Sequence, residues 1–270
     1  MRLFIEFIQF IRDIIKNRRL LLTLAVDDFK QEYLGSYLGL IWAFIKPAVF
    51  IIVIWFVFEV GIRLAPSKDG VPFVLWLING FAAWFFFSES LSSGVNAIIS
   101  KSFLVKKVDF RVSILPVINI LSALIIHMIF LVIMVIIFLC NGYFPTVYWL
   151  QLPFYTFCLF ILLLGLNWLV ASLRLFIQDI KHIVNILLQV GFWGTPIFWS
   201  MTLVPDEYQL FIKLNPMYFI VSGYRDTFIN EQWFWNRGYS LVVFWIISLF
   251  FFILGAVVFK RLRPHFGDVL

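Results

Sequence analysis

The chain has 270 residues, of which 63% are hydrophobic, 20% aromatic and only 13% charged, and its mean hydropathy is +0.98. This composition excludes a soluble domain with a single core and indicates an all-α, polytopic integral membrane protein. The net charge of +6 does not indicate nucleic-acid binding, because the basic residues lie in short groups between apolar runs and form no single patch.

Residues 1–19 place apolar and charged side chains on opposite faces of a helix. This pattern predicts an amphipathic helix lying in the membrane interface. It is equally the pattern of a helix docked on a partner protein. Both interpretations place the segment at the cytoplasmic surface, and we expect the mature chain to start near Met1, because no cleavable signal pattern follows it.

The first predicted span covers residues 37–62, where an apolar run is interrupted by only two charges, Lys46 and Glu59. Gly35, Gly39 and Ala43 are spaced four apart, which predicts a bare helix face for close packing against another helix.

A second face of the same span is partly aromatic and contains Tyr37, Phe44 and Trp55. We expect this face to border a pathway. Lys46 lies two to three turns into the span, where it either extends to the cytoplasmic headgroups or attracts an anionic lipid headgroup.

Five further apolar runs complete a prediction of six transmembrane helices, at residues 73–99, 113–140, 152–172, 183–199 and 238–259. Charged residues interrupt residues 201–237, yet residues 217–221 are apolar. We therefore expect short re-entrant helices there, on the extracytoplasmic side before the last span.

The loop at residues 100–112 interleaves basic and apolar side chains, which predicts a short helix that presents apolar groups to a soluble partner. Its candidate coupling residues are Phe103, Leu104, Lys106, Lys107 and Phe110. Fifteen of the 21 Lys and Arg residues fall in the terminal segments and in the loops predicted on the same side of the membrane as the termini, and five fall in the loops on the opposite side. This asymmetry places both termini in the cytoplasm.

A polar stripe marks the start of the fifth predicted span, because His182, Asn185, Gln189 and Trp193 are spaced three, four and four apart. Polar groups inside a membrane usually face the bundle interior or a wet cavity, so the stripe is a candidate pathway lining. Hydrogen bonding to a neighbouring helix is the alternative. The eleven tryptophans and nine tyrosines fit sugar stacking or, more simply, interface belts.

The sequence contains no motif that is typical of catalysis, phosphate binding or metal binding. The phosphate-binding pattern G-x-x-x-x-G-K-[ST], the zinc pattern H-E-x-x-H and the hydrolase pattern G-x-S-x-G are absent from the sequence. The three histidines are dispersed, and Cys140 and Cys158 form neither a disulfide framework nor a metal pattern. We therefore expect a non-enzymatic chain that holds no metal or cofactor.

The sequence resembles the ABC-2 permease family, the membrane subunits of ATP-binding cassette exporters for lipid-linked cell-envelope polymers, and is most similar to the wall teichoic acid members. The segments that carry the resemblance span nearly the whole chain in order: DFK at 28–30, GLIW at 39–42 with Pro47, WFVF at 55–58, GIR at 61–63, SFLVKK at 102–107 with LP at 115–116, QDI at 178–180, TPI at 195–197, LNP at 214–216, YRD at 224–226, WFW at 233–235 and the tail at 259–269.

The resemblance implies a homodimer in the bacterial plasma membrane, with two nucleotide-binding ATPase subunits that carry ATP and Mg²⁺. Residues 100–111 then correspond to a coupling helix. The implied substrate is an undecaprenyl-diphosphate-linked glycan or poly(alditol phosphate), which would enter headgroup first past Lys30, Tyr33 and Lys46. An O-antigen or capsular polysaccharide is the alternative to wall teichoic acid.

Two other classes compete with the exporter. A polyprenyl-lipid transferase would use the Asp27 and Asp28 pair for a metal, but the sequence has no second acidic motif to accompany it. A secondary transporter would show an internal repeat of its spans, and none is visible.

Overall fold

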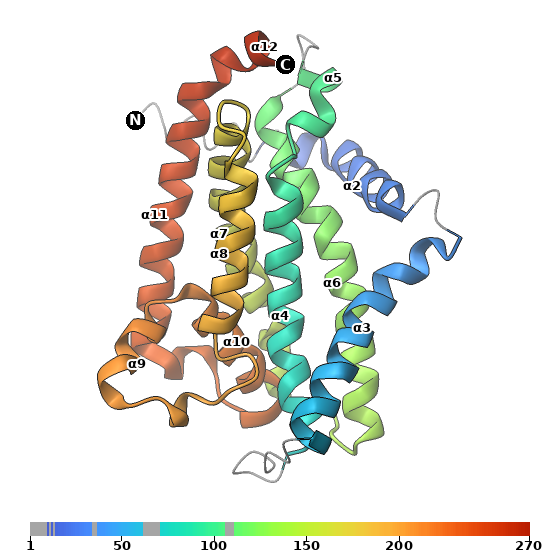
Figure 1. Cartoon of the computed structure of the whole chain (residues 1–270), viewed down its shortest axis with the longest axis vertical. Helices are drawn as coiled ribbons and strands as arrows, with labels where there is room; N and C mark the ends of the chain where they lie inside the picture. Colours follow the sequence, from blue (N-terminus) through green and yellow to red (C-terminus); the bar gives the residue numbers. More distant parts are fainter. Residues whose placement is uncertain (1–9, 11, 13, 34–36, 62–70, 106–110) are drawn as a thin grey trace.

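The computed structural model describes residues 10, 12, 14–33, 37–61, 71–105 and 111–270, and within these ranges it contains helices and connecting turns but no strand. The helices form an elongated bundle (Figure 1). The helix α12 (Phe266–Val269) lies at one end, and α9 (Asp206–Lys213) lies near the other. We call these the α12 end and the α9 end. The predicted all-α architecture is confirmed for the described residues.

Within the described residues, four helices are long and apolar enough to cross a membrane. They are α4 (Phe73–Gly94), α6 (Leu115–Cys140), α7 (Leu152–Arg174) and α11 (Gly238–Leu262). The shortest has 22 residues, which at about 1.5 Å per residue matches a hydrocarbon core of about 30 Å. Four of the six predicted spans therefore coincide with candidate membrane-spanning helices, although α4 ends five residues before the predicted 99.

Glycine permits a close backbone contact between α7 and α11. A Cβ atom on Gly255 would lie 2.1 Å from the carbonyl oxygen of Gly165, and one on Gly165 would lie 2.6 Å from the backbone of Phe252. Side chains at these two positions would therefore force the helices apart. Small residues allow such backbone contact in membranes, where dispersion forces replace the hydrophobic effect as the source of helix association.

The other two predicted spans correspond to shorter helices. The first contains α3 (Trp42–Trp55), which continues as a π-helical segment, η2 (Phe56–Gly61). The second contains α8 (Ile180–Gly194), which starts three residues before and ends five residues before the predicted 183–199, because the chain becomes extended at Thr195, just before Pro196. At 15 residues, α8 is only about 22 Å long.

The helix α2 (Arg18–Tyr33) and the 3₁₀ turn η1 (Gly39–Ile41) precede α3. Gly39 has φ +51°, a left-handed conformation that favours glycine. The prediction that Gly35, Gly39 and Ala43 share one helix face is therefore wrong for Gly39 and Ala43. Gly39 lies in a turn of the chain, and only Ala43 belongs to α3. Gly35 lies outside the described residues.

The segment between α8 and α11 folds back into the bundle at the α9 end. The 3₁₀ turn η6 (Met201–Leu203) and α9 lead to α10 (Pro216–Arg225), followed by η7 (Asp226–Asn230) and η8 (Phe234–Arg237). Asn215 caps α10 by accepting a hydrogen bond from the Met217 backbone N–H. All residues of α10 from Met217 to Arg225 are buried, so this short helix is part of the core.

Short turns join the remaining elements. They are η3 (Ile99–Lys101), α5 (Ser102–Val105), η4 (Val112–Ile114), η5 (Val147–Gln151) and η9 (Arg263–His265). The predicted amphipathic helix at residues 1–19 lies mostly outside the described residues, as does the second half of the predicted coupling loop.

Candidate functional site

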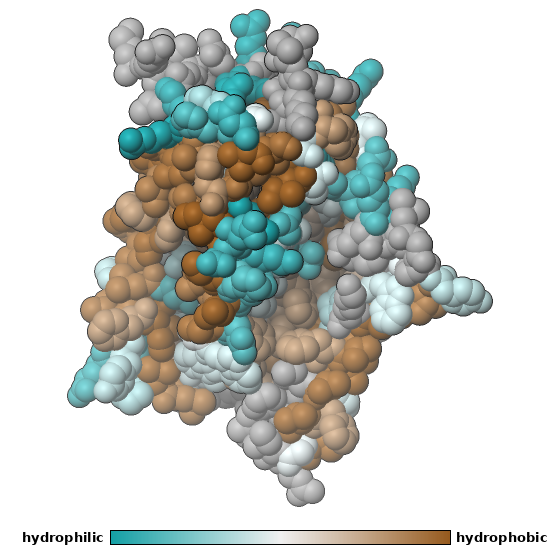
Figure 2. All heavy atoms as spheres, turned by 45° about the horizontal axis from the view of Figure 1, so that its top comes forward, coloured by the Kyte–Doolittle hydropathy of each residue, from teal (hydrophilic) through white to brown (hydrophobic). Residues whose placement is uncertain are grey.

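The predicted polar stripe lies on the open face of α8. His182, Asn185, Gln189 and Trp193 are all exposed, whereas the buried Val184 marks the face that packs against the bundle. Figure 2 shows hydrophilic side chains in a band down the middle of this view, over the region of α8 and α4, with apolar surface beside it. Within the described residues, the side chains of the stripe therefore form no hydrogen bond to a neighbouring helix.

Large apolar side chains flank the stripe on α8. They are Ile183, Ile186, Leu187 and Val190, each between 48% and 63% exposed. Apolar groups alone would be stable against lipid, but imidazole and amide groups facing hydrocarbon lose their hydrogen bonds with water, at a cost of about 1–3 kcal/mol each. This face therefore requires either a wet cavity or a partner surface.

The helix α3 packs against α4, contacts α8 through the ring of Phe50, and also has an open face. The Phe50 ring contacts Phe81 of α4 at 5.1 Å and Phe192 of α8 at 6.0 Å between centroids. Large apolar residues that remain exposed include Trp42, Val49, Ile52 and Val53 of α3 and Phe56 at the start of η2. The open faces of α3 and α8 thus adjoin through a cluster of aromatic rings.

The other pathway candidates are placed differently. Lys30 and Tyr37 are exposed, Phe44 packs against the small cluster of Phe29 and Ala43, and Trp55 is half-buried against the main core. The structure therefore brings neither Phe44 nor Trp55 into the open α8 face. The side chains of Tyr33 and Lys46 lie outside the described part of the chain.

A buried arginine holds the α9 end of α8. The guanidinium of Arg225 donates hydrogen bonds to the carbonyl oxygens of Pro196 at 2.7 Å and Ile197 at 2.6 Å. Its Cζ lies 3.4 Å from the centre of the Trp76 ring, a cation–π contact. A Cβ on Gly80 would approach both the Ile197 oxygen and Arg225 to 3.0–3.1 Å, so a larger residue here would require these neighbours to shift by a few tenths of an ångström.

The neighbouring Asp226 is fully buried and forms an ion pair with Arg237. Arg237 donates one hydrogen bond from Nε to Oδ2 of Asp226 and a second from its terminal guanidinium nitrogen to Oδ1, at 2.8 Å. Asn230 donates to the same carboxylate at 2.9 Å. The sequence placed Arg225 and Asp226 among the charges that interrupt residues 201–237, but it did not predict that they form a buried cluster. The adjacent apolar residues 217–221, which belong to the same helix, were the available signal.

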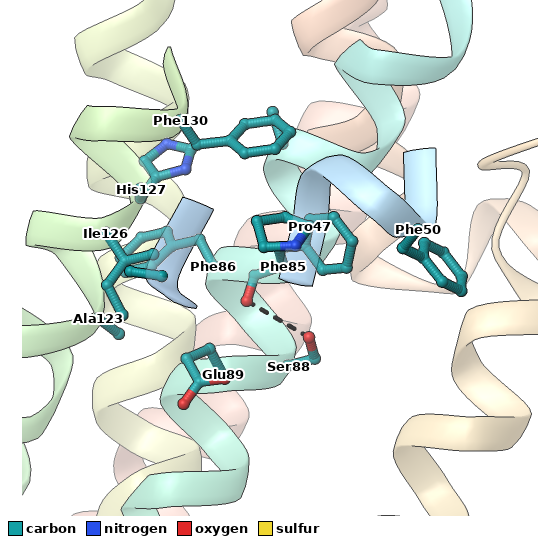
Figure 3. Close-up of a pocket in the computed structure, with 12 residues that line it drawn as sticks. Pro47, Phe50, Phe85, Phe86, Ser88, Glu89, Ala123, Ile126, His127 and Phe130 are labelled. Carbon is teal, nitrogen blue, oxygen red and sulfur yellow. Dashed lines mark hydrogen bonds between the residues drawn. The ribbon is translucent and has the colours of Figure 1, made fainter. Parts of the chain in front are cut away.

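A cavity of about 270 Å³ lies between α3, α4 and α6 (Figure 3). Pro47, Phe86 and Phe130 line it, and His127 borders it with its ring stacked on Phe86 at 4.8 Å and its Nε2 2.8 Å from the Tyr224 hydroxyl. A second cavity of about 460 Å³ shares Glu89 with the first and is lined mostly by polar side chains up to α2. The inner side of α3 is therefore loosely packed.

An ion pair links α2 to the start of the predicted coupling segment. Lys101 Nζ lies 2.5 Å from Asp28 Oδ2, and the Lys101 side chain is only 9% exposed. Of the coupling candidates, Phe103 is exposed and Leu104 is buried. Lys106, Lys107 and Phe110 lie outside the described residues. Among those that are described, no group of three or more His, Cys, Asp and Glu residues is placed to hold a metal ion.

The four long apolar helices of the described residues, together with an open face that carries a polar stripe, are features of an integral membrane protein with a candidate path or partner surface within the membrane. Residues 19–229 match the family described as ABC-2 type transporter, and the chain belongs to this family. The resemblance found in the sequence is thereby confirmed.

Several related proteins align with this chain over most of their own length. The O-antigen export system permease protein RfbA of Myxococcus xanthus is 27% identical over 97% of this chain and 99% of the relative. An RfbA protein of Klebsiella pneumoniae is 25% identical over 93% and 95%. The polysialic acid transport protein KpsM of Escherichia coli is 22% identical over 84% and 88%.

Proposed function

We propose that this protein is the permease subunit of an ABC exporter that moves a lipid-linked surface polysaccharide of the O-antigen or capsule type out of the cytoplasm. The names of relatives that match nearly end to end support this substrate class. They favour it over wall teichoic acid, the substrate first expected from the sequence. The chain itself forms the path, and ATP with Mg²⁺ binds separate partner subunits.

The open face of α8 is the observation that carries the proposal. Two copies related by a twofold axis bury the apolar residues of α3 and α8 against each other, since such an interface is self-complementary. The stripe from His182 to Trp193 then lines a wet path between the copies. Hydroxyl-rich sugars hydrogen-bond to Asn185 and Gln189, and the Trp193 ring, 58% exposed, offers a stacking surface.

The topology of the proposal has six crossings. The helix α3 with η2 provides the first, and α8 provides the fifth, which is completed at the α9 end by the re-entrant α9 and α10. The greater number of Lys and Arg residues at the α12 end makes this the cytoplasmic end. Phe103 then projects toward the ATPase.

Coupling between ATP and the path runs through α2 in this mechanism. Movement of the segment at Ser102–Val105 pulls on Lys101, whose ion pair with Asp28 transmits the pull to α2. Because α2 leads through the turn at Gly39 into α3, the pull shifts α3 relative to α8. The cavities behind α3 give this helix room to move.

Thiol labelling tests the wet path. In a Cys140→Ser background, Gln189→Cys is expected to react with a membrane-impermeant thiol reagent in the assembled complex in lipid, and Ile246→Cys is not. Ile246 is 63% exposed on α11 and is the matched control, because it faces lipid in the proposal. Equal labelling of the two positions, or none at Gln189, contradicts the path along α8.

Export itself is tested by co-expression with a candidate ATPase subunit, in a strain that lacks its own permease. Polysaccharide at the cell surface, together with ATP turnover stimulated by the lipid-linked polymer in nanodiscs, is the expected result. Stimulation by a poly(alditol phosphate) polymer and not by a polysaccharide would return the assignment to wall teichoic acid. Turnover by the purified chain alone would instead identify a transferase.

A further inference from the structure

The two cavities behind α3 adjoin each other and differ in chemical character. We call the cavity of about 270 Å³ the aromatic cavity, because phenylalanine side chains dominate its lining: Phe50, Phe85, Phe86 and Phe130. We call the cavity of about 460 Å³ the polar cavity, because amide, hydroxyl and carboxylate side chains dominate its lining. Glu89, Ala123 and Ile126 line both cavities, so the two spaces meet at these residues.

The polar cavity lies between α2, α4 and α6. Asn119 Nδ2 donates to Ser93 Oγ at 2.6 Å, which joins α6 to α4 at its wall. The side chains of Gln31, Asn96 and Ser122 also line the cavity and form no hydrogen bond with other described residues. Ser122 is only 9% exposed. A polar group in such a place needs water or a bound ligand as its hydrogen-bond partner.

The chemistry of the polar cavity selects an uncharged ligand. None of its described lining residues is Lys, Arg or His, so a phosphate group would find no cationic partner on this part of the wall. The carboxylate of Asp28 on the wall is already paired with Lys101. Sugar hydroxyl groups, in contrast, both donate to and accept from amide and hydroxyl side chains.

Together, the two cavities are complementary to an amphiphile. Figure 3 shows side chains of α3, α4 and α6 around the aromatic cavity, with Glu89 on one side. The sizes of the cavities are close to or within the range of about 300–1,000 Å³ that is typical of ligand pockets. Each methylene group buried among the phenylalanine rings strengthens binding about fourfold, while the hydrogen bonds at the other end select the head.

We propose that the adjoining cavities bind an uncharged glycolipid of the cytoplasmic leaflet, with its sugar in the polar cavity and the upper part of an acyl chain in the aromatic cavity. The polar cavity borders α2, which lies toward the α12 end (Figure 1). The bound lipid fills the space behind α3 and restrains the shift of α3 relative to α8. This restraint rests on the proposed function, whereas the binding does not.

Native mass spectrometry of the full chain, in a detergent without a sugar head, tests the site with monoglucosyl diacylglycerol as the probe. Wild-type protein is expected to retain this lipid in preference to phosphatidylglycerol, which is anionic, and to diacylglycerol, which has no sugar. Ser122→Ala should weaken retention about threefold, and Ser122→Ala with Asn96→Ala about tenfold, because each lost hydrogen bond costs about a factor of three. The matched control is Ser248→Ala, which removes a buried hydroxyl that lines neither cavity.

A further variant tests the place where the two cavities meet and changes no polar group. Ala123→Leu adds an apolar side chain there and should weaken retention of the glucosyl lipid more than tenfold while the protein still elutes as a folded species. Equal losses from Ser122→Ala and Ser248→Ala would overturn the site. Retention of phosphatidylglycerol or diacylglycerol at the level of the glucosyl lipid would overturn it as well.

ATP turnover measures the restraint on α3 separately. Added monoglucosyl diacylglycerol should slow turnover by the wild-type chain assembled with its ATPase subunits, and should slow it less in the variant with both Ser122→Ala and Asn96→Ala. Selective retention with unchanged turnover would overturn the restraint. The retention measurement uses the chain alone, so failure of polysaccharide export would contradict the proposed function and leave the binding result standing.

Discussion

Replacing Arg225 by lysine is the sharpest test of how α8 is held at the α9 end. The arginine donates two hydrogen bonds at 2.6–2.7 Å and stacks on Trp76. Lysine keeps the charge but reaches one carbonyl oxygen at best and loses the planar stack. Hydrogen bonds to charged groups contribute about 1.5–3 kcal/mol each, and a cation–π contact about 1 kcal/mol.

We therefore expect Arg225→Lys to lower the free energy of unfolding by about 2–4 kcal/mol. At about 2 °C per kcal/mol for a chain of this size, the thermal unfolding midpoint in detergent falls by about 4–8 °C. Arg261→Lys is the matched control, because Arg261 is exposed on α11, and its midpoint should stay within about 1 °C of wild type.

Function provides a second readout for the same variant. Because the two carbonyl oxygens belong to the residues directly after α8, loss of the clamp displaces the end of the polar stripe. Export per folded molecule is therefore expected to fall in Arg225→Lys and to stay unchanged in Arg261→Lys. An Arg225→Lys protein with a wild-type unfolding midpoint would refute the reasoning, whatever its export rate.

Two further changes test the helix contact and the coupling route. Gly255→Ala should lower the free energy of unfolding by about 1–3 kcal/mol, because the added Cβ meets the carbonyl oxygen of Gly165. Gly267→Ala is the control and should have almost no effect on thermal unfolding, because a Cβ at Gly267 has open space around it. Asp28→Asn and Lys101→Met should each uncouple ATP turnover from export, and a double-mutant cycle should give a coupling energy of about 1–3 kcal/mol. A coupling energy below about 0.3 kcal/mol would remove the ion pair from the coupling route.

Long apolar runs predicted the membrane-spanning core because burial in lipid imposes a minimum length on every crossing helix. Four of the six predicted runs correspond to the candidate membrane-spanning helices of the described residues. The stripe on α8 was also predictable, since a period of 3.6 fixes which side chains share a face, and its four residues do share the open face. That it lines a path stays a prediction.

Features that depend on contacts between distant segments were not predictable in the same way. Lys101 belongs to a basic loop in the sequence, yet it is buried and paired with Asp28, 73 residues away. Similarly, the spacing of Gly35, Gly39 and Ala43 fits a continuous helix, but the left-handed backbone at Gly39 interrupts it. A one-dimensional pattern does not show which glycine bends the chain.

The carbonyl oxygens left after the end of α8 and the buried guanidinium of Arg225 stabilise each other. Pro196 has no N–H to continue the helix, and the carbonyl oxygens of Pro196 and Ile197 are left within the bundle without helical partners. A guanidinium buried in the same place would be equally unstable alone. Together they satisfy one another, and the positive charge also lies at the negative end of the α8 dipole. The α9 end of α8 is thereby fixed, so in the proposed dimer the movement that opens the path is expected at the α12 end, where Asp28 and Lys101 connect α2 to the predicted coupling segment.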